Sequence, residues 1–189
     1  MCLTLPAECP THEMFNVVLI EPEIPPNTGN IGRLCLATRS TLHLVKPLGF
    51  SLEDRQLKRA GLDYWSEVDV QLWDSFAQLQ SKQLSTARYF FLTTKSGQAY
   101  YDVKFHQGNF LVFGRETKGL PKNLLAANID NCLTIPMHGT RSLNLATAVA
   151  VVLFEAARQQ RWRKRLSAKS YIFLDRPRHP KIDNGTLNK

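Results

Sequence analysis

The chain has 189 residues, enough for one domain with a large hydrophobic core. Its apolar content of 43% and charged content of 21% are ordinary for a soluble globular protein. No apolar run approaches the roughly 20 residues that span a bilayer, and the start of the chain lacks a basic segment followed by a long apolar one. These totals exclude a membrane-spanning protein, and we expect a cytoplasmic one.

The net charge of +8 is concentrated at one end of the chain. Residues 1–157 contain 14 basic and 14 acidic residues, whereas residues 158–189 contain 10 basic and 2 acidic ones, which gives 10 − 2 = +8. Basic residues interspersed with Trp162 and Tyr171 suit a polyanion. A solvated tail without a partner explains the same composition equally well.

The four cysteines do not have the paired spacing of a metal site. Cys35 and Cys132 lie in apolar stretches and are expected to be buried thiols. We therefore expect no metal in this protein.

In chain order, the hydrophobic pattern alternates between strands and helices. Residues 1–13 are predicted to be a disordered extension. Strands, most of them continuous apolar runs typical of buried parallel strands, are predicted at residues 15–20, 42–45, 68–70, 88–94, 109–113 and 132–135. Helices are predicted at residues 34–38, 53–60, 74–84, 122–127 and 143–157, and the last is expected to be buried because it is apolar nearly all round. This alternation predicts an α/β domain with a mainly parallel sheet flanked by helices.

Three prolines determine the structure predicted for the segment after the first strand. Glu21-Pro-Glu-Ile-Pro-Pro26 is predicted to be non-helical because three prolines restrict it and its neighbours. The next residues, from Asn27 to Arg33, lead into the predicted helix at 34–38, which Asn27 or Thr28 is expected to cap.

Four loops rich in polar groups follow predicted strands, at residues 27–33, 93–97, 114–121 and 136–144. Ligands of open parallel sheets bind outside the carboxyl ends of the strands, so these loops predict a shared ligand site. Neither G-x-G-x-x-G nor G-x4-G-K-[ST] occurs, which disfavours a Rossmann dehydrogenase and a P-loop NTPase. No catalytic triad is legible, and His138 is expected to be a hydrogen-bonding residue of its loop.

The loop before the last helix has two interpretations. Ser142 or Asn144 can cap the helix by accepting hydrogen bonds from its first backbone N–H groups. Alternatively, the same helix N-terminus can face a small molecule. This segment alone favours the cap.

Three ordered motifs carry a resemblance to a known family. The motifs of the SPOUT RNA 2′-O-methyltransferases resemble three segments of this chain: Asn27-Thr-Gly-Asn-Ile-Gly-Arg33, Phe113-Gly-Arg-Glu-Thr-Lys-Gly-Leu-Pro121, and Ile135-Pro-Met137 followed by Arg141-Ser-Leu-Asn-Leu-Ala-Thr-Ala-Val149. The segment from Ile20 to Asn30 and Arg59-Ala-Gly-Leu-Asp-Tyr64 are similar to the small tRNA (cytidine/uridine-34) 2′-O-methyltransferases, which act at the wobble nucleotide. The resemblance covers residues 14–162, the expected methyltransferase domain, and leaves out the basic tail at 163–189.

This resemblance implies an α/β fold with a C-terminal trefoil knot that binds S-adenosylmethionine, with S-adenosylhomocysteine as product. Carried over by position, the cofactor-binding residues are Leu92, Thr93, Gly114, Glu116, Ile135, Met137, Ser142, Leu143 and Asn144. The implied catalytic residues are Arg33, Glu116, Ser142 and Asn144, and the implied substrate-binding residues are Asn27, Asn30, Arg33 and Arg141.

The implied reaction is attack of a ribose 2′-hydroxyl on the sulfonium methyl group. A guanidinium is a poor base at neutral pH, so we expect Arg33 to stabilise charge and to clamp a phosphate. Without the motif, Arg33 is better explained as a helix-surface ion pair. Glu116 can instead cap the helix that begins near Pro121, and Asn27 and Asn30 can be turn residues.

The family also implies a homodimer acting on the tRNA anticodon stem-loop, with residues of the first motif completing the partner's site. Two features depart from the wobble-enzyme pattern: Arg115 stands where proline is common, and His138-Gly-Thr140 makes a shorter loop. The alternatives are 2′-O-methylation of another tRNA position or of rRNA, a non-catalytic RNA-binding protein on the same scaffold, and a small-molecule methyltransferase.

Overall fold

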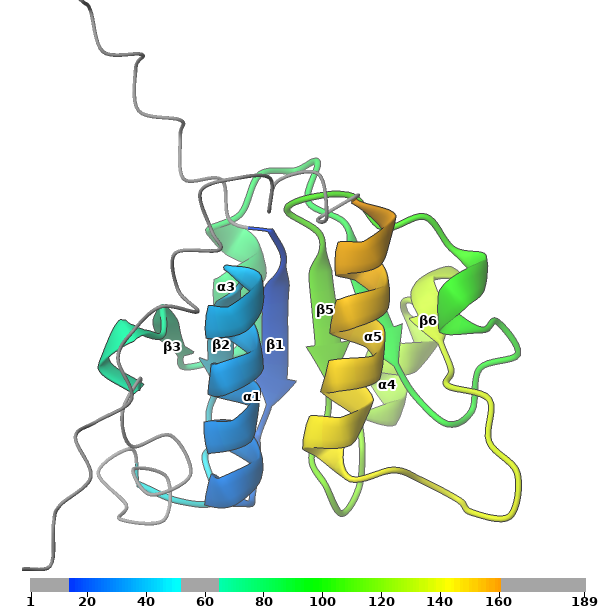
Figure 1. The fold of residues 1–189 in the computed structure, drawn as a ribbon, viewed down its shortest axis with the longest axis horizontal. Coiled ribbons are helices and arrows are strands. Elements are labelled where there is room, and N and C mark those ends of the chain that lie inside the picture. The colour runs from blue at the N-terminus through cyan, green and yellow to red at the C-terminus, as the bar shows by residue number, and fades with distance from the viewer. Residues whose placement is uncertain (1–13, 52–64, 161–189) are drawn as a thin grey trace, which may run out of the picture.

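A computed structural model describes residues 14–51 and 65–160 of the chain, and these residues form a sheet between two layers of helices (Figure 1). Six strands lie in the order β3-β2-β1-β5-β4-β6, and every pairing is parallel. Their bounds are β1 Asn16–Ile20, β2 Thr41–Val45, β3 Val70–Trp73, β4 Tyr89–Leu92, β5 Phe110–Phe113 and β6 Cys132–Leu133. The predicted parallel α/β sheet is confirmed.

In the described residues, two helices cover each face of the sheet. The bounds are α1 Pro25–Thr38, α3 Phe76–Ser81, α4 Lys122–Ala126 and α5 Leu145–Gln159, with short 3-10 helices at Trp65–Glu67, Tyr100–Asp102 and Ile129–Asn131. Helices α1 and α5 lie side by side in front of the sheet in Figure 1, and α3 and α4 lie behind it. Each side has its own hydrophobic core, because alternate residues of the central strands point to opposite faces. The N-termini of α1 and α5 lie at the same end of the molecule as the carboxyl end of β1 (Figure 1).

Helix α1 corrects the interpretation of the prolines. The segment at 21–26 was predicted to be non-helical, but Pro25 and Pro26 occupy the first positions of the helix. Proline is tolerated there because the N–H group it lacks has no partner within the helix. The residue before the helix is Ile24, which makes no side-chain cap, so the caps predicted at Asn27 and Thr28 are wrong.

Other predicted bounds shift or shorten. The strand predicted at 68–70 is β3 at Val70–Trp73, and the helix predicted at 74–84 is the shorter α3 at Phe76–Ser81. Ser75 caps α3 by accepting a hydrogen bond from the backbone N–H of Gln78. The helix predicted at 53–60 and the predicted extension and tail lie outside the described residues.

Helix α5 is not buried all round, contrary to the expectation from its apolar sequence. Val149, Val152 and Leu153 are fully buried against the sheet, whereas Phe154 is 40% exposed. The exposed side faces away from the sheet because only one face of a helix can pack against it.

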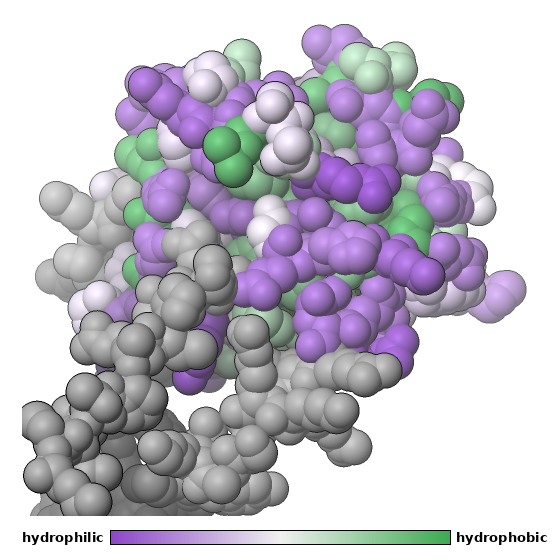
Figure 2. Space-filling view, turned by 90° about the horizontal axis from the view of Figure 1, so that it is seen from above, coloured by the Kyte–Doolittle hydropathy of each residue, from purple (hydrophilic) through white to green (hydrophobic). Residues whose placement is uncertain are grey.

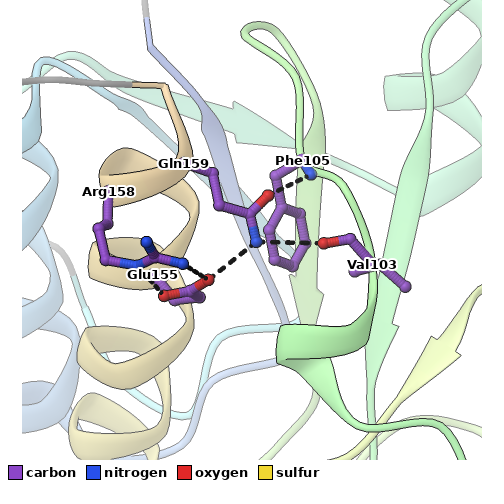
Figure 3. A network of polar contacts seen from close by, with 5 residues as sticks. All are labelled: Val103, Phe105, Glu155, Arg158 and Gln159. Carbon is purple, nitrogen blue, oxygen red and sulfur yellow. Dashed lines mark hydrogen bonds and ion pairs between the residues drawn. The ribbon is translucent and has the colours of Figure 1, made fainter.

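The last turn of α5 is tied to the segment that follows β4, as Figure 3 shows. The Gln159 side chain accepts a hydrogen bond from the Phe105 backbone N–H at 2.9 Å and donates to the Val103 carbonyl at 3.1 Å. It also donates to Glu155, whose carboxylate forms an ion pair with Arg158. Gln159 thereby fixes the position of the segment at 103–105 along the helix.

Hydrophilic residues dominate the end of the molecule where the strands begin. Figure 2 views this end from above, and apolar residues appear there only as small separate patches among the described residues. In the described ranges, none of the helices has the length and apolarity needed to cross a bilayer. Cys35 and Cys132 are buried free thiols, as predicted.

Candidate active site

The loops at the carboxyl ends of the strands enclose a cavity of about 1430 Å³. Three of the four loops predicted to converge supply most of its lining, at residues 93–97, 114–120 and 137–144. The fourth contributes Asn27, which is joined by Ile24 from the preceding turn. The loops converge because parallel strands end at the same edge of the sheet.

The structure brings together most of the predicted site residues. All nine predicted cofactor residues line the cavity, and so do Asn27 and Arg141. Asn30 and Arg33 do not line it and instead lie exposed on α1. The cavity thus combines apolar side chains such as Leu92 with polar groups, the mixture that is typical of small-ligand sites.

Gly114 lets the loop after β5 fold back tightly on itself. A Cβ atom at Gly114 would lie 2.2 Å from the carbonyl carbon of Gly119, closer than real atoms approach. Gly119 has a φ of +66° and donates its backbone N–H to the Arg115 carbonyl at 2.9 Å. Glycine at both positions is therefore required by the shape of this cavity wall.

The Glu116 carboxylate caps α1 from a distant part of the chain. It accepts hydrogen bonds from the backbone N–H groups of Glu23 at 2.9 Å and Ile24 at 3.3 Å, and from the Asn27 side-chain amide at 3.0 Å. A carboxylate at this position also interacts favourably with the positive end of the helix dipole. The alternative that Glu116 caps the helix near Pro121 is wrong, because both of its carboxylate oxygens accept hydrogen bonds at the start of α1.

Asn27 and Asn144 join the N-termini of α1 and α5. The Asn144 side-chain amide donates to the Asn27 side-chain oxygen at 2.9 Å, and Asn27 is only 6% exposed. The Asn144 oxygen accepts from the backbone N–H groups of Ala146 and Thr147 at 2.9 and 3.3 Å. The cap interpretation is confirmed for Asn144, and the side chain also holds Asn27 in place.

Two further contacts to the loop after β1 were missed by the sequence analysis. Arg115 forms an ion pair with Glu21 at 2.5 Å, and the Thr117 hydroxyl donates to the Glu23 carboxylate at 2.7 Å. The pKa of the Glu23 carboxyl group is lowered from its usual value, mainly because the Thr117 side chain donates a hydrogen bond to it. The signal in the sequence was an acidic loop and a loop with basic and hydroxyl groups, each following a strand of the same sheet.

The cavity lining carries more positive than negative charge. Its basic residues are Lys95, Arg115, Lys118, Lys122 and Arg141, and the sequence analysis assigned a binding role only to Arg141. The acidic residues in the lining are Glu116, whose carboxylate is already engaged, and Asp130. This balance favours an anionic ligand or substrate. In the part of the chain that the structure describes, no cluster of metal-binding side chains occurs.

Comparison with known families gives a match to the SpoU rRNA methylase family over residues 14–154. Among curated proteins, the chain is 49% identical over 151 residues to a tRNA (cytidine(34)-2′-O)-methyltransferase of Saccharophagus degradans, covering 77% of this chain and 96% of the relative. It is also 49% identical over 148 residues to the protein of the same name from Methylovorus glucosotrophus, with the same coverage of both chains.

Two solved structures extend the comparison. One, reported for the 2-OH methylation of C/U34 on tRNA, has 46% sequence identity and a TM-score of 0.76, and covers 80% of this chain and 99% of its own. The other is the SpoU methyltransferase AviRb of Streptomyces viridochromogenes in complex with the cofactor AdoMet. Its identity is 25% and its TM-score 0.69, covering 81% of this chain and 63% of its own.

Proposed function

The chain belongs to the SpoU rRNA methylase family and is an RNA 2′-O-methyltransferase, and we propose that its substrate is the ribose of nucleotide 34 in tRNA. The observation that carries this proposal is the 49% identity to tRNA (cytidine(34)-2′-O)-methyltransferases over nearly their whole length. Methylation of another tRNA position or of rRNA is the second candidate, which the rRNA methylases in the family favour.

We assign the cavity at the carboxyl ends of the strands to S-adenosylmethionine. The apolar side chains of Leu92, Ile135 and Leu143 are suited to an adenine ring, and Met137 adds a further apolar contact. The close backbone approach at Gly114 leaves main-chain groups, rather than a side chain, to meet the polar edge of the ligand. Thr93 and Ser142 complete the lining with hydroxyl groups.

When bound, S-adenosylmethionine supplies a methyl group that its sulfonium already activates, so the chain's residues mainly position the ribose and stabilise charge. Arg33 clamps the phosphate next to the target nucleotide and stabilises the charge that develops as the hydroxyl loses its proton. Ser142 orients the substrate. Glu116 and Asn144 act through Asn27, whose orientation their hydrogen bonds fix.

Asn30 and Arg33 point to a homodimer. Both residues lie exposed on α1 and outside the cavity of their own chain, so a second copy is needed to bring them to a cofactor. The exposed side of α5, which includes Phe154, offers an apolar surface next to α1 for such a contact. In the dimer, Asn30 and Arg33 of one copy meet the tRNA bound at the cavity of the other, together with Asn27 and Arg141.

We further assign a trefoil knot to the C-terminal part of residues 14–162. The segment after β4 is hydrogen-bonded to the chain near β6, through Gln98 and Tyr100 with Thr134, and to the end of α5. This segment therefore contacts the chain both before and after the loop at residues 136–144, which supports a threaded path.

We assign residues 163–189 as a basic tail that binds tRNA phosphates without sequence preference. We also propose that the protein works in the cytoplasm. The tail carries most of the excess positive charge. Deleting residues 164–189 is expected to weaken tRNA binding and to flatten its salt dependence, because each lost phosphate contact reduces the number of counterions released. Filter binding at several salt concentrations measures both effects, and unchanged binding contradicts this role.

The experiment that tests the proposed function is incubation of the protein with total tRNA and S-adenosylmethionine carrying a labelled methyl group. Nucleoside analysis of the product is expected to find the label in 2′-O-methylcytidine or 2′-O-methyluridine. Label on a base atom, or no label in tRNA, contradicts the proposal. The same assay on rRNA distinguishes the second candidate.

A further inference from the structure

Two loops lie side by side along one wall of the cavity, the loop at residues 21–24 after β1 and the loop at 114–120 after β5. Strands β1 and β5 are hydrogen-bonded neighbours, so the loops leave the sheet next to each other. Three consecutive residues of the second loop each bind the first. Arg115 pairs with Glu21, Glu116 accepts from two backbone N–H groups, and Thr117 donates to Glu23.

The other side of the first loop is held by β2 and the turn after it. The Glu21 backbone N–H donates to the Val45 carbonyl, and the Gly49 N–H donates to the Pro22 carbonyl, both at 2.9 Å. A Cβ atom at Gly49 would lie 2.8 Å from the Glu23 Cα atom, so the two segments are in close contact. The first loop is therefore enclosed, and the contacts from residues 115–117 set its position on the cavity side.

Glu21 adopts a backbone conformation that side chains rarely take. Its φ is 52°, in the left-handed region that is uncommon for residues other than glycine, asparagine and aspartate. Such conformations persist where the surrounding structure fixes them, and they cluster at ligand-binding sites. The partner that fixes the Glu21 side chain is Arg115, whose side chain is 34% exposed and lines the cavity.

We propose that Arg115 and Glu21 are positioning residues for the methyl donor: their ion pair holds the two loops in the arrangement that binds the cofactor. This inference rests on the proposed function, because it assumes that S-adenosylmethionine occupies the cavity. A contact maintained by charge weakens as salt screens it.

The expected effect of Arg115→Ala is a loss of about tenfold in affinity for S-adenosylhomocysteine, because the loop after β5 is freed from the loop after β1. The KM for the methyl donor is expected to rise while kcat with saturating donor changes little. The variant Glu21→Gly separates the effect of the lost carboxylate from any effect of backbone strain, since glycine accepts a φ of 52° without strain. If the carboxylate is what matters, this variant binds as weakly as Arg115→Ala.

The test is calorimetric titration of S-adenosylhomocysteine into the full chain and its variants at low and high salt. The set comprises Arg115→Glu, Glu21→Arg, the double exchange Glu21→Arg/Arg115→Glu, and Lys46→Ala as a matched control. Lys46 pairs with Asp74 at 2.9 Å outside the cavity, so its loss is expected to leave affinity unchanged. Thermal midpoints of all variants show whether each one folds.

The proposal expects weak binding by the folded single variants, recovery in the double exchange, and wild-type affinity that falls with salt more steeply than in Arg115→Ala. Wild-type affinity in Arg115→Ala, or a double exchange no better than the singles, overturns it while leaving the proposed function intact. If the wild-type chain itself does not bind S-adenosylhomocysteine, both the inference and the proposed function fail.

Discussion

The structure contains two polar networks that differ in what they connect. At the cavity, Glu116, Asn27 and Asn144 link three segments far apart in the sequence and lie along the wall of an open site. Inside the sheet, the buried His43 ring contacts Trp73 at 3.0 Å and Asn16 at 2.9 Å, away from the cavity. The first network positions loops that meet a ligand, whereas the second only fixes neighbouring strands.

His43 illustrates how the inner network is closed. Its Nδ1 atom accepts the Trp73 indole N–H, so the proton of the neutral ring lies on Nε2 and is donated to the Asn16 side-chain oxygen. Asn16 in turn donates to the Gly108 carbonyl. Burial lowers the pKa of His43 to about 4, although the nearby Asp69 carboxylate acts in the opposite direction. We therefore expect substitutions at the cavity to change function first and substitutions near His43 to change stability first.

The largest expected effect separates function from stability. Arg33→Ala is expected to lower turnover by about a thousandfold or more, since it removes the group that stabilises developing charge. Its affinity for S-adenosylhomocysteine and its thermal midpoint are expected to stay close to those of the wild type, because the proposed role of Arg33 is to contact the tRNA rather than the cofactor, and its side chain lies exposed on α1. Single-turnover kinetics and calorimetry measure the two quantities. A collapse of cofactor binding shows that the role assigned to Arg33 is wrong.

The second experiment measures stability as a function of pH, and it tests the network around His43 rather than the cavity. The pKa of His43 is lowered from 6.5 to about 4 by folding, so the unfolded chain binds the additional proton between these pH values. The stability that His43 contributes is thus complete above pH 6.5 and lost as the pH falls toward 4, a change of about 3 kcal/mol. Urea unfolding at a series of pH values measures it.

The variant His43→Phe provides the control for this titration. It is expected to be less stable at pH 7, because the Trp73 indole N–H loses its acceptor, but its stability is expected to vary less between pH 6.5 and 4. Methyl transfer at pH 7 by the folded variant is expected to stay near the wild-type rate. An equal pH dependence in both proteins contradicts the role of His43.

Asn144 is expected to give the smallest and most mixed effect, because it belongs to the cavity network and also caps α5. Asn144→Ala is expected to reduce the free energy of unfolding by about 2 kcal/mol, of which the lost cap contributes roughly 1 and the unpaired Asn27 oxygen the rest. Cofactor affinity is expected to fall several-fold.

Asn144→Asp separates these two contributions. The aspartate keeps an oxygen that accepts from the Ala146 and Thr147 N–H groups, but it cannot donate to Asn27. It is expected to retain most of the stability and to lose cofactor affinity. If its affinity equals that of the wild type, the bond between Asn144 and Asn27 does not position the site.

Much of the fold could be predicted because it is encoded locally. Apolar runs such as residues 109–113 have the length and composition of buried parallel strands, and the carboxyl-end rule then placed Thr93, Gly114 and Ser142 around one cavity. The start of α1 was missed because prolines that break a helix interior are accepted in its first turn, so the same residues have opposite meanings at different positions.

The contacts within the site could not be predicted from the sequence. Glu116 and Ile24 are 92 residues apart, and Asn144 and Asn27 are 117 apart, so no local pattern pairs them. The pairing of Arg115 with Glu21 had only an indirect signal, an acidic loop and a loop with basic and hydroxyl groups that each follow a strand. Such contacts follow from strand order, since β1 and β5 become neighbours only when the sheet is assembled.

The most direct test of the proposed activity is to locate the methyl group in the tRNA product. After incubation with S-adenosylmethionine, nuclease fragments of a purified tRNA substrate are sequenced by mass spectrometry. The account predicts one added methyl group on the ribose of nucleotide 34 with the wild-type chain, and none with Arg33→Ala. A methyl group on a base, or on the ribose of other nucleotides only, contradicts it.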